Sequence, residues 1–236
     1  MRIHQITDLH IPDEESGGKF AHVRGNVQNL IAFVAEDNTD LLVISGDLTM
    51  RDGSQPACEW LKSILPAPGK VIVMPGNHDE LSVLWDVFGP ETCVNDEFYF
   101  TSQAGGKKLI FADSSSDTLP EVQLEFLRNE GRESSILFIH HPPDLVSDGF
   151  MARNQPLTNH AAVSEVIRSS EITDVFCGHY HNSVDKDCDG FQLHVTPSPA
   201  FQIDLHSPEF KPESFEPAVR VIEVDDDSIN TWLAYP

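Results

Sequence analysis

The sequence predicts an α/β fold built from a mixed β-sheet or from two sheets packed together. Short apolar runs alternate with segments whose apolar residues recur at helical spacing, as in α/β chains. Two predicted antiparallel hairpins interrupt this alternation and argue against a purely parallel sheet. A chain of 236 residues is long enough to bury one full core. We therefore expect a single domain over residues 1–236, with residues 207–236 forming a C-terminal loop and hairpin.

Six runs of apolar or β-branched residues predict buried strands. Each run is three or four residues long and ends in polar residues or in Gly or Pro, which suits a strand covered on both faces. The runs are Ile3–Ile6, Leu41–Ile44, Val71–Met74, Leu109–Ala112, Ile136–Ile139 and Val175–Cys177.

Three segments between these runs predict helices. The first carries apolar residues at helical spacing, namely Val23, Val27, Leu30, Ile31 and Val34. The second begins at Pro120, a favourable first helical residue, and places Val122, Phe126 and Leu127 on or near one face. The third spans roughly Asn159 to Arg168.

Two hairpins and one loop complete the predicted elements. Phe98–Ser102 and Lys108–Ala112 flank Ala104-Gly105-Gly106, which is typical of a turn. Near the end of the chain, Val219–Val224 and Ile229–Tyr235 flank a polar segment in the same way. The segment SPEFKPESFEP at 207–217 is rich in Pro and Glu and predicts a surface loop.

The composition of the chain limits which binding partners and which cellular compartment are expected. A net charge of −23 disfavours nucleic acids and anionic membranes, although bound divalent cations would reverse the sign locally. The four cysteines, Cys58, Cys93, Cys177 and Cys188, form no C-x-x-C pair and predict free, partly buried thiols. The N-terminal MRIHQITDLH shows no secretory signal, and no apolar run could span a membrane. We expect a cytoplasmic protein.

Residues of metal-ligand type follow five of the predicted strands. They lie in Asp8-Leu9-His10, Gly46-Asp47, Gly76-Asn77-His78-Asp79, His140-His141-Pro142-Pro143 and Gly178-His179-Tyr180-His181. Any one of these histidines alone is more often a hydrogen-bonded core or surface residue. In open α/β sheets, however, ligands bind where the loops after the strands converge. Five such loops carrying Asp, His or Asn are hard to explain by packing and predict one site.

The ordered set resembles the calcineurin-like metallophosphoesterase superfamily over residues 1 to about 205. Within it, the GNHD sequence, the HHPP run and the stretch 111–115 (FADSS) are most similar to class III cyclic nucleotide phosphodiesterases and bacterial glycerophosphodiesterases. The resemblance implies a two-sheet mixed β-sandwich flanked by helices, a four-layer αββα fold. It also implies hydrolysis of small phosphodiesters at a binuclear metal centre. Short relatives of this branch often form homodimers.

The resemblance assigns each motif a role. Asp8, His10 and His181 would hold one metal, Asn77, His140 and His179 the other, and Asp47 would bridge both. A hydroxide between the ions would be the nucleophile, because metal binding lowers the pKa of water toward about 7. Imidazole mixed with carboxylate suits Mn, Fe, Zn or Co rather than Ca or Mg.

Four further residues have roles that the sequence leaves partly open. His78 is expected beside the phosphate as a catalytic and substrate-binding residue, with Asn77 as a further substrate contact. Asp79 would orient His78 or cap the following helix. His141 would either support a ligand or contact substrate. Arg51 lies at a spacing used for phosphate by Ser/Thr protein phosphatases, but without their surrounding sequence it predicts a surface loop.

Four other functions are weighed as alternatives. The motifs fix a metal centre rather than a leaving group, so a phosphomonoesterase or nucleotide hydrolase could use the same site. A metal-free binding scaffold is disfavoured because all seven ligand positions are filled. A nuclease is disfavoured by the negative charge. A lipid-precursor hydrolase of the superfamily would carry Arg in place of His78.

Overall fold

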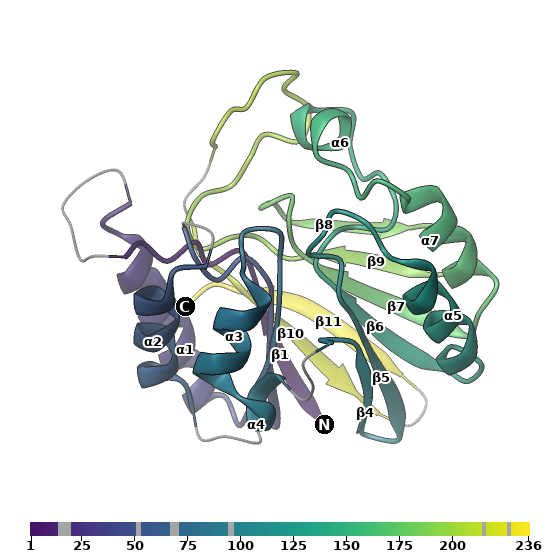
Figure 1. Cartoon of the computed structure of the whole chain (residues 1–236), viewed down its shortest axis with the longest axis horizontal. Helices are drawn as coiled ribbons and strands as arrows, with labels where there is room; N and C mark the ends of the chain where they lie inside the picture. Colours follow the sequence, from purple (N-terminus) through teal and green to yellow (C-terminus); the bar gives the residue numbers. More distant parts are fainter. Residues whose placement is uncertain (14–19, 51–52, 67–70, 94–96, 214–215, 226–227) are drawn as a thin grey trace.

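Two mixed β-sheets pack face to face, and helices cover the outer face of each sheet (Figure 1). The computed structural model describes residues 1–13, 20–50, 53–66, 71–93, 97–213, 216–225 and 228–236. The layers follow the order helix, sheet, sheet, helix. This arrangement confirms the predicted two-sheet α/β fold.

The first sheet has the strand order β11-β10-β1-β2-β3. Its strands are β1 (Arg2–Ile6), β2 (Leu41–Ser45), β3 (Val71–Met74), β10 (Val219–Val224) and β11 (Ile229–Ala234). β1, β2 and β3 run parallel, so the loops after them leave from one edge. The C-terminal hairpin extends this sheet, because β10 pairs antiparallel with β1.

The second sheet has the order β4-β5-β6-β7-β9-β8. Its strands are β4 (Phe100–Ala104), β5 (Lys107–Ala112), β6 (Ser135–Ile139), β7 (Ile172–Cys177), β8 (Val184–Asp187) and β9 (Gln192–Val195). β5, β6, β7 and β9 are parallel, and β4 and β8 close the two edges as antiparallel strands.

The helices divide between the two sheets (Figure 1). α1 (Val23–Glu36), α2 (Gln55–Ile64), α3 (Leu81–Phe88) and α4 (Pro90–Cys93) lie beside the first sheet. α5 (Glu121–Glu130) and α7 (His160–Arg168) cover the second. The short α6 (Phe150–Asn154) stands above the sheets beside a long loop from the C-terminal third of the chain.

Three apolar clusters hold the layers together, one between the sheets and one under each helical layer. Between the sheets, Phe100, Phe111, Phe138 and Phe176 stack across neighbouring strands with centroids 4.6, 5.2 and 5.4 Å apart. Such aromatic pairs add to the burial of apolar area. This rigid frame fixes the strand ends from which the polar loops emerge.

All six predicted strands and both predicted hairpins are confirmed. The first hairpin turns at Gly105 and Gly106, both with positive φ, so Ala104 belongs to the strand rather than to the turn. The three predicted helices are present, but one expected face is wrong. Val122 is 56% exposed, because α5 buries Gln123, Leu124 and Leu127 instead.

Three further features can be compared with the predictions from the sequence: the start of α5, the state of the cysteines and the length of the apolar helices. Pro120 is the N-cap of α5 rather than its first residue. All four cysteines lie in the described part of the chain, and each is a buried free thiol, as predicted. Among the described residues, no helix is long and apolar enough to cross a membrane.

Candidate metal centre

The five polar loops meet at one edge of the two sheets. They follow the carboxyl ends of β1, β2 and β3 in the first sheet and of β6 and β7 in the second. These strands are parallel within each sheet, so their loops converge. The structure thereby brings together residues that are up to 173 positions apart, from Asp8 to His181.

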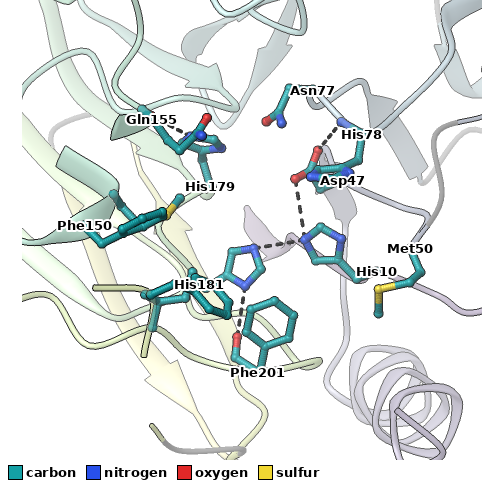
Figure 2. A pocket seen from close by; sticks show the side chains of 13 residues that line it. His10, Asp47, Met50, Asn77, His78, Phe150, Gln155, His179, His181 and Phe201 are labelled. Atoms are coloured by element: carbon teal, nitrogen blue, oxygen red, sulfur yellow. Dashed lines mark hydrogen bonds and ion pairs between the residues drawn. The ribbon is translucent and has the colours of Figure 1, made fainter. Parts of the chain in front are cut away.

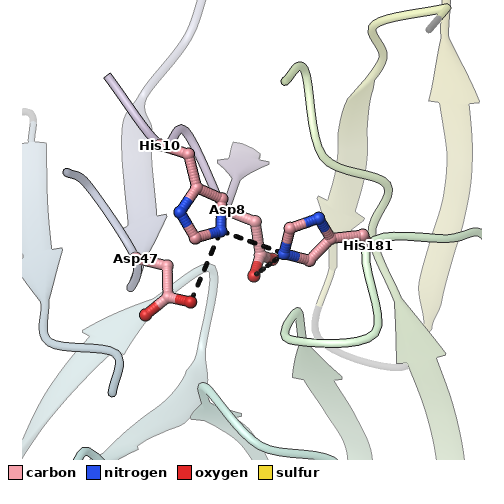
Figure 3. Close-up of side chains that lie close together, drawn as sticks. All are labelled: Asp8, His10, Asp47 and His181. Atoms are coloured by element: carbon pink, nitrogen blue, oxygen red, sulfur yellow. Dashed lines mark hydrogen bonds and ion pairs between the residues drawn. The ribbon is translucent and has the colours of Figure 1, made fainter. Parts of the chain in front are cut away.

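The first cluster consists of Asp8, His10, Asp47 and His181, all buried (Figure 3). One ligand atom from each of them lies within 4.8 Å of all the others. The Nε2 atoms of His10 and His181 are 3.0 Å apart, and Nε2 of His181 is 3.3 Å from Oδ1 of Asp8. Two imidazole nitrogens and two carboxylates facing one point form a set that suits a transition-metal ion.

The second cluster consists of Asp47, His140 and His179, again within 4.8 Å and buried. Oδ1 of Asn77 and Nε2 of His140 are buried without a hydrogen-bond partner among the described residues. Buried polar atoms are normally paired, so two orphaned ligand atoms require an explanation. A divalent ion between them would satisfy both, and the residues present therefore fit a second metal.

Asp47 is the one residue that belongs to both clusters. Its Oδ2 lies 3.5 Å from Nε2 of His10, and its Oδ1 lies 3.5 Å from Nε2 of His140. Each carboxylate oxygen thus faces a different cluster. This geometry allows one carboxylate to link two cations.

Three of the histidines are oriented by backbone carbonyls. Nδ1 of His140 donates to the carbonyl of Ser45 (2.8 Å), and Nδ1 of His181 donates to that of Phe201 (3.0 Å). Nε2 of His179 donates to the carbonyl of Gln155 (2.8 Å). Each hydrogen bond keeps the proton on one ring nitrogen and leaves the lone pair of the other nitrogen available for a metal. Proteins usually set the tautomer and orientation of metal-binding imidazoles in this way. No residue type signals a carbonyl contact, so the sequence could not reveal these partners.

The pKa values favour ligand protonation states at most of these positions. Burial lowers the pKa of His10 to about 4, with His181 contributing, and burial also places the pKa of His179 well below its usual value. Burial alone would raise the pKa of Asp8, but His181 and His140 hold it below its usual range. Neutral imidazoles and charged carboxylates are the forms that bind metal.

His140 is the exception. Burial alone would lower its pKa, but the carboxylates of Asp47 and Asp8 raise it to about 10. The positive charge of protonated His140 therefore offsets part of the negative charge of the Asp47 and Asp8 carboxylates. A divalent cation at this position would take over that role and release the proton.

The loop backbones are strained at the candidate ligands. Asp8, His10, Asp47, His179 and His181 all have positive φ, between 42° and 65°. Asp and His tolerate this left-handed region better than most residues, but it still has a cost. The structure around these loops overcomes that cost, which is typical of functional sites.

A glycine precedes three of the candidate ligands because the loops approach one another closely. A β-carbon at Gly46 would meet the ring of His140, and one at Gly76 would overlap the carboxylate of Asp47. One at Gly178 would overlap Asp8 and Thr7. The glycines of the three motifs are therefore required by contacts between loops.

His78 and Asp79 lie on the loop after β3, close to the residues of both clusters. The backbone N–H of His78 donates to Oδ1 of Asp47 (2.9 Å), and the His78 ring lies edge-on to His10 at 5.1 Å. The Asp79 carboxylate accepts from the N–H groups of Leu48 (3.0 Å) and Gly76 (2.9 Å). Burial and the Asp47 carboxylate raise the pKa of Asp79 to about 7.

Asp79 therefore ties together the loops after β2 and β3. The alternative that it caps the following helix is wrong, because the N-cap of α3 is Glu80.

His141 supports the second cluster from behind. Its ring lies 4.0 Å from that of His179, centroid to centroid, and is almost completely buried. Its Nδ1 lies 2.9 Å from the hydroxyl of Ser114, and its Nε2 lies 3.2 Å from Oδ1 of Asp117. Ser114 belongs to the FADSS stretch, which thereby acquires a structural role. Of the two roles left open for His141, this placement favours support of a ligand.

A pocket of about 310 Å³ opens over the two clusters (Figure 2). Its polar side includes His10, Asp47, Asn77, His78, His179 and His181. The rest of its lining is largely apolar and includes Phe150, Phe201 and Phe210. A volume near the lower end of the usual range for ligand pockets suits a small molecule.

The structure thus brings together all seven predicted metal ligands, together with His78 and Asp79. His141 lies behind the second cluster and is not among the pocket-lining residues. Arg51, assigned to a surface loop from the sequence, lies outside the described residues. Sequence reasoning missed the apolar side of the pocket, because its phenylalanines carry no motif.

Comparisons with known proteins agree with this geometry. A family model described as calcineurin-like phosphoesterase matches residues 1–183. The chain is 31% identical to a "Probable cyclic nucleotide phosphodiesterase" of Fibrobacter succinogenes, over 100% of this chain and 94% of that protein. It is 23% identical to the 3′,5′-cyclic adenosine monophosphate phosphodiesterase of Escherichia coli, over 98% and 88% of the two chains.

A solved structure shares the fold at low sequence identity. The dimetal phosphatase of Danio rerio superposes with a TM-score of 0.72 at 14% identity, covering 98% of this chain and 95% of its own.

Proposed function

Because the chain belongs to the calcineurin-like phosphoesterase family, we propose that it hydrolyses small phosphodiesters and that 3′,5′-cyclic nucleotides are its substrate class. The relatives named above support the substrate class, and they match almost the whole length of the chain. The size of the pocket also suits a small ester.

The observation that carries the proposal is the position of Asp47 between the two clusters. Its two oxygens each lie 3.5 Å from a histidine of a different cluster. A carboxylate in this position could be shared by two divalent ions, the arrangement used by two-metal phosphoesterases.

The proposed ligands divide as the clusters do. Asp8, His10 and His181 would hold one ion, and Asn77, His140 and His179 would hold the other, with Asp47 shared. When bound, such a pair supplies charge stabilisation for the phosphate and an activated water as nucleophile. Imidazole, carboxylate and amide ligands favour Mn, Fe, Zn or Co.

The protein's own residues have complementary tasks. The backbone carbonyls of Ser45, Gln155 and Phe201 keep three imidazoles aimed at the site. Hydrolysis breaks a P–O bond, and the departing oxygen needs a proton. His78, at the pocket wall, would donate a hydrogen bond to the phosphate or supply that proton. Asp79 fixes the loop that carries His78, through Leu48 and Gly76.

The remaining proposals concern the domain organisation, the cellular compartment and the binding partners of the protein. We treat residues 1–236 as a single domain, since β10 and β11 of the C-terminal hairpin complete the first sheet. Four free buried thiols support a reducing compartment such as the cytoplasm. A small phosphate ester is the proposed partner, and neither nucleic acid nor membrane is expected at a net charge of −23.

The test is hydrolysis by chelator-stripped protein to which Mn, Fe, Zn and Co are added back singly. We expect activity on 3′,5′-cyclic nucleotides and on bis(p-nitrophenyl) phosphate to return with metal, with weaker activity on p-nitrophenyl phosphate. Preference for the monoester would replace the diesterase proposal with a phosphomonoesterase. Failure to bind metal would indicate a scaffold.

A further inference from the structure

The apolar side of the pocket is built from two segments far apart in the sequence (Figure 2). Phe150 and Met151 come from α6, whereas Phe201 and Phe210 come from the segment 201–212. Together these four residues form what we call the aromatic wall. One end of the wall, Phe201, lies against the rings of His10 and His181.

The segment 201–212 is folded back on itself. Ile203 forms an antiparallel bridge with Pro212, and the N–H of Asp204 donates to the carbonyl of Lys211 (2.8 Å). A salt bridge between Lys211 and Asp204 (2.7 Å) reinforces the pairing. This short hairpin carries Phe210 near its tip.

The hairpin is joined to α6. The N–H of Phe150 donates to the carbonyl of Ser207 (2.7 Å). A β-carbon at Gly149 would overlap the carbonyl of Leu205, so the two backbones approach as closely as glycine allows. The aromatic wall is therefore a built surface and not a chance arrangement of loops.

The rings of the wall form a continuous series that starts at the metal cluster. The ring of His181 lies 4.5 Å from that of Phe201. Phe201 lies 5.9 Å from Phe210, and Phe210 lies 5.9 Å from Phe150. Phe210 is 48% exposed, although aromatic burial normally stabilises a fold. A large exposed ring at the mouth of a polar site is typical of a contact surface for ligand.

One polar side chain accompanies these rings. Gln155 follows α6 and lines the pocket, and its backbone carbonyl orients His179. Its side-chain amide offers both donors and an acceptor. This combination matches the edge of a purine, to which Gln and Asn bind through paired hydrogen bonds.

We propose that the aromatic wall binds the nucleobase of the substrate, with Phe210 stacking on the face of the base and Gln155 hydrogen-bonding to its edge. Phe150, whose ring is inclined at 75° to that of Phe210, contacts the rim of the base. This inference rests on the proposed cyclic nucleotide hydrolysis and assigns the residues that determine its specificity. The phosphate lies over the metal cluster, and the base extends toward the hairpin. Phe201 has a different task, because it also orients His181.

The test compares ligands with and without a base. For the metal-loaded protein, calorimetry gives the Kd of adenosine 5′-monophosphate and of ribose 5-phosphate, and kinetics give KM for cyclic AMP. We expect Phe210→Ala to raise Kd for the nucleotide and KM for cyclic AMP by roughly 5- to 150-fold, the range found when a base loses its stacking partner. Kd for ribose 5-phosphate should not change, and Phe210→Tyr should restore nucleotide affinity.

Trp232→Ala is the matched control, because Trp232 is a similarly exposed aromatic (42%) outside the pocket. It should leave all three constants unchanged. Gln155→Leu should lower affinity for adenine nucleotides more than for a nucleotide with another base. Equal wild-type affinity for adenosine 5′-monophosphate and ribose 5-phosphate would overturn the inference, as would an unchanged KM in Phe210→Ala. Absence of cyclic nucleotide hydrolysis in the wild type would instead refute the proposed function.

Discussion

Gly178 lies so close to Asp8 that a β-carbon at residue 178 would overlap the Asp8 carboxylate. The two residues follow β7 and β1, which belong to different sheets. The N–H of His179 also donates to both oxygens of Asp8, at 3.0 and 2.9 Å. The metal centre thus forms across the junction of the sheets, and glycine is needed where their loops meet.

We expect Gly178→Ala to displace the Asp8 carboxylate and to lower metal affinity by roughly 10–100-fold, the scale for losing support of a ligand. Metal analysis after dialysis measures this loss. Gly25→Ala is the control, because a β-carbon at Gly25 in α1 meets nothing within 4 Å. That change should leave metal binding intact and stabilise the fold by up to about 1 kcal/mol. Wild-type metal affinity in Gly178→Ala would show that the loops can separate freely.

Asp47→Asn should reduce both metal content and activity more than Asp8→Asn. The substitution keeps the size of the side chain but removes the charge shared by two clusters, whereas Asp8 belongs to one. Metal content per chain and kcat with bis(p-nitrophenyl) phosphate are the measurements. Equal losses in the two variants would mean that Asp47 does not bridge.

His78→Ala should keep its metals and lose kcat by roughly 10²–10⁴, the scale for a general acid or a charge-stabilising donor. The loss should be smaller for a p-nitrophenyl ester than for a cyclic nucleotide, because p-nitrophenolate departs without a proton. Metal analysis and kcat on both esters test this. Loss of metal would instead make His78 a ligand, and equal impairment on both esters would leave only charge stabilisation.

His194 should make folding stability depend on pH. Its ring is buried on β9, with Nδ1 2.7 Å from Asp185 and Nε2 3.3 Å from Asp174. Burial alone would lower the pKa of His194, and Arg220 also opposes the charge, but hydrogen bonds to the two aspartates outweigh both, and the pKa is raised. The stabilisation is therefore fully present below the unfolded pKa of about 6.5 and is lost as pH rises through the folded pKa.

Denaturant unfolding of His194→Gln should accordingly show a larger loss of stability at about pH 6 than at about pH 9. His4→Gln is the control, because its loss of stability should depend on pH in the opposite direction. Burial lowers the pKa of His4, so its neutral form stabilises the fold above about pH 6.5 and that stabilisation fades as pH falls. A loss for His194→Gln that does not vary with pH would contradict the assignment of its charge.

The sequence alone predicted both hairpins, every described strand except β8 and β9, and the set of residues able to bind metal, whereas the two-sheet arrangement followed from the family resemblance. Apolar runs mark buried strands directly, and Asp, His and Asn at strand ends are visible without coordinates. The sequence misjudged the buried face of α5, where Val122 is exposed, because helical spacing gives several candidate faces and only packing selects one.

Only the tertiary structure decided how these parts act together. It showed that the two oxygens of Asp47 face different clusters, and that carbonyls of Ser45, Gln155 and Phe201 orient three histidines. It also joined α6 to the hairpin that carries Phe210. A sequence pattern records the type of each side chain, whereas backbone contacts between distant segments depend on where the chain returns in space. Such contacts carry no residue signature, and they are what form the metal centre and its aromatic wall.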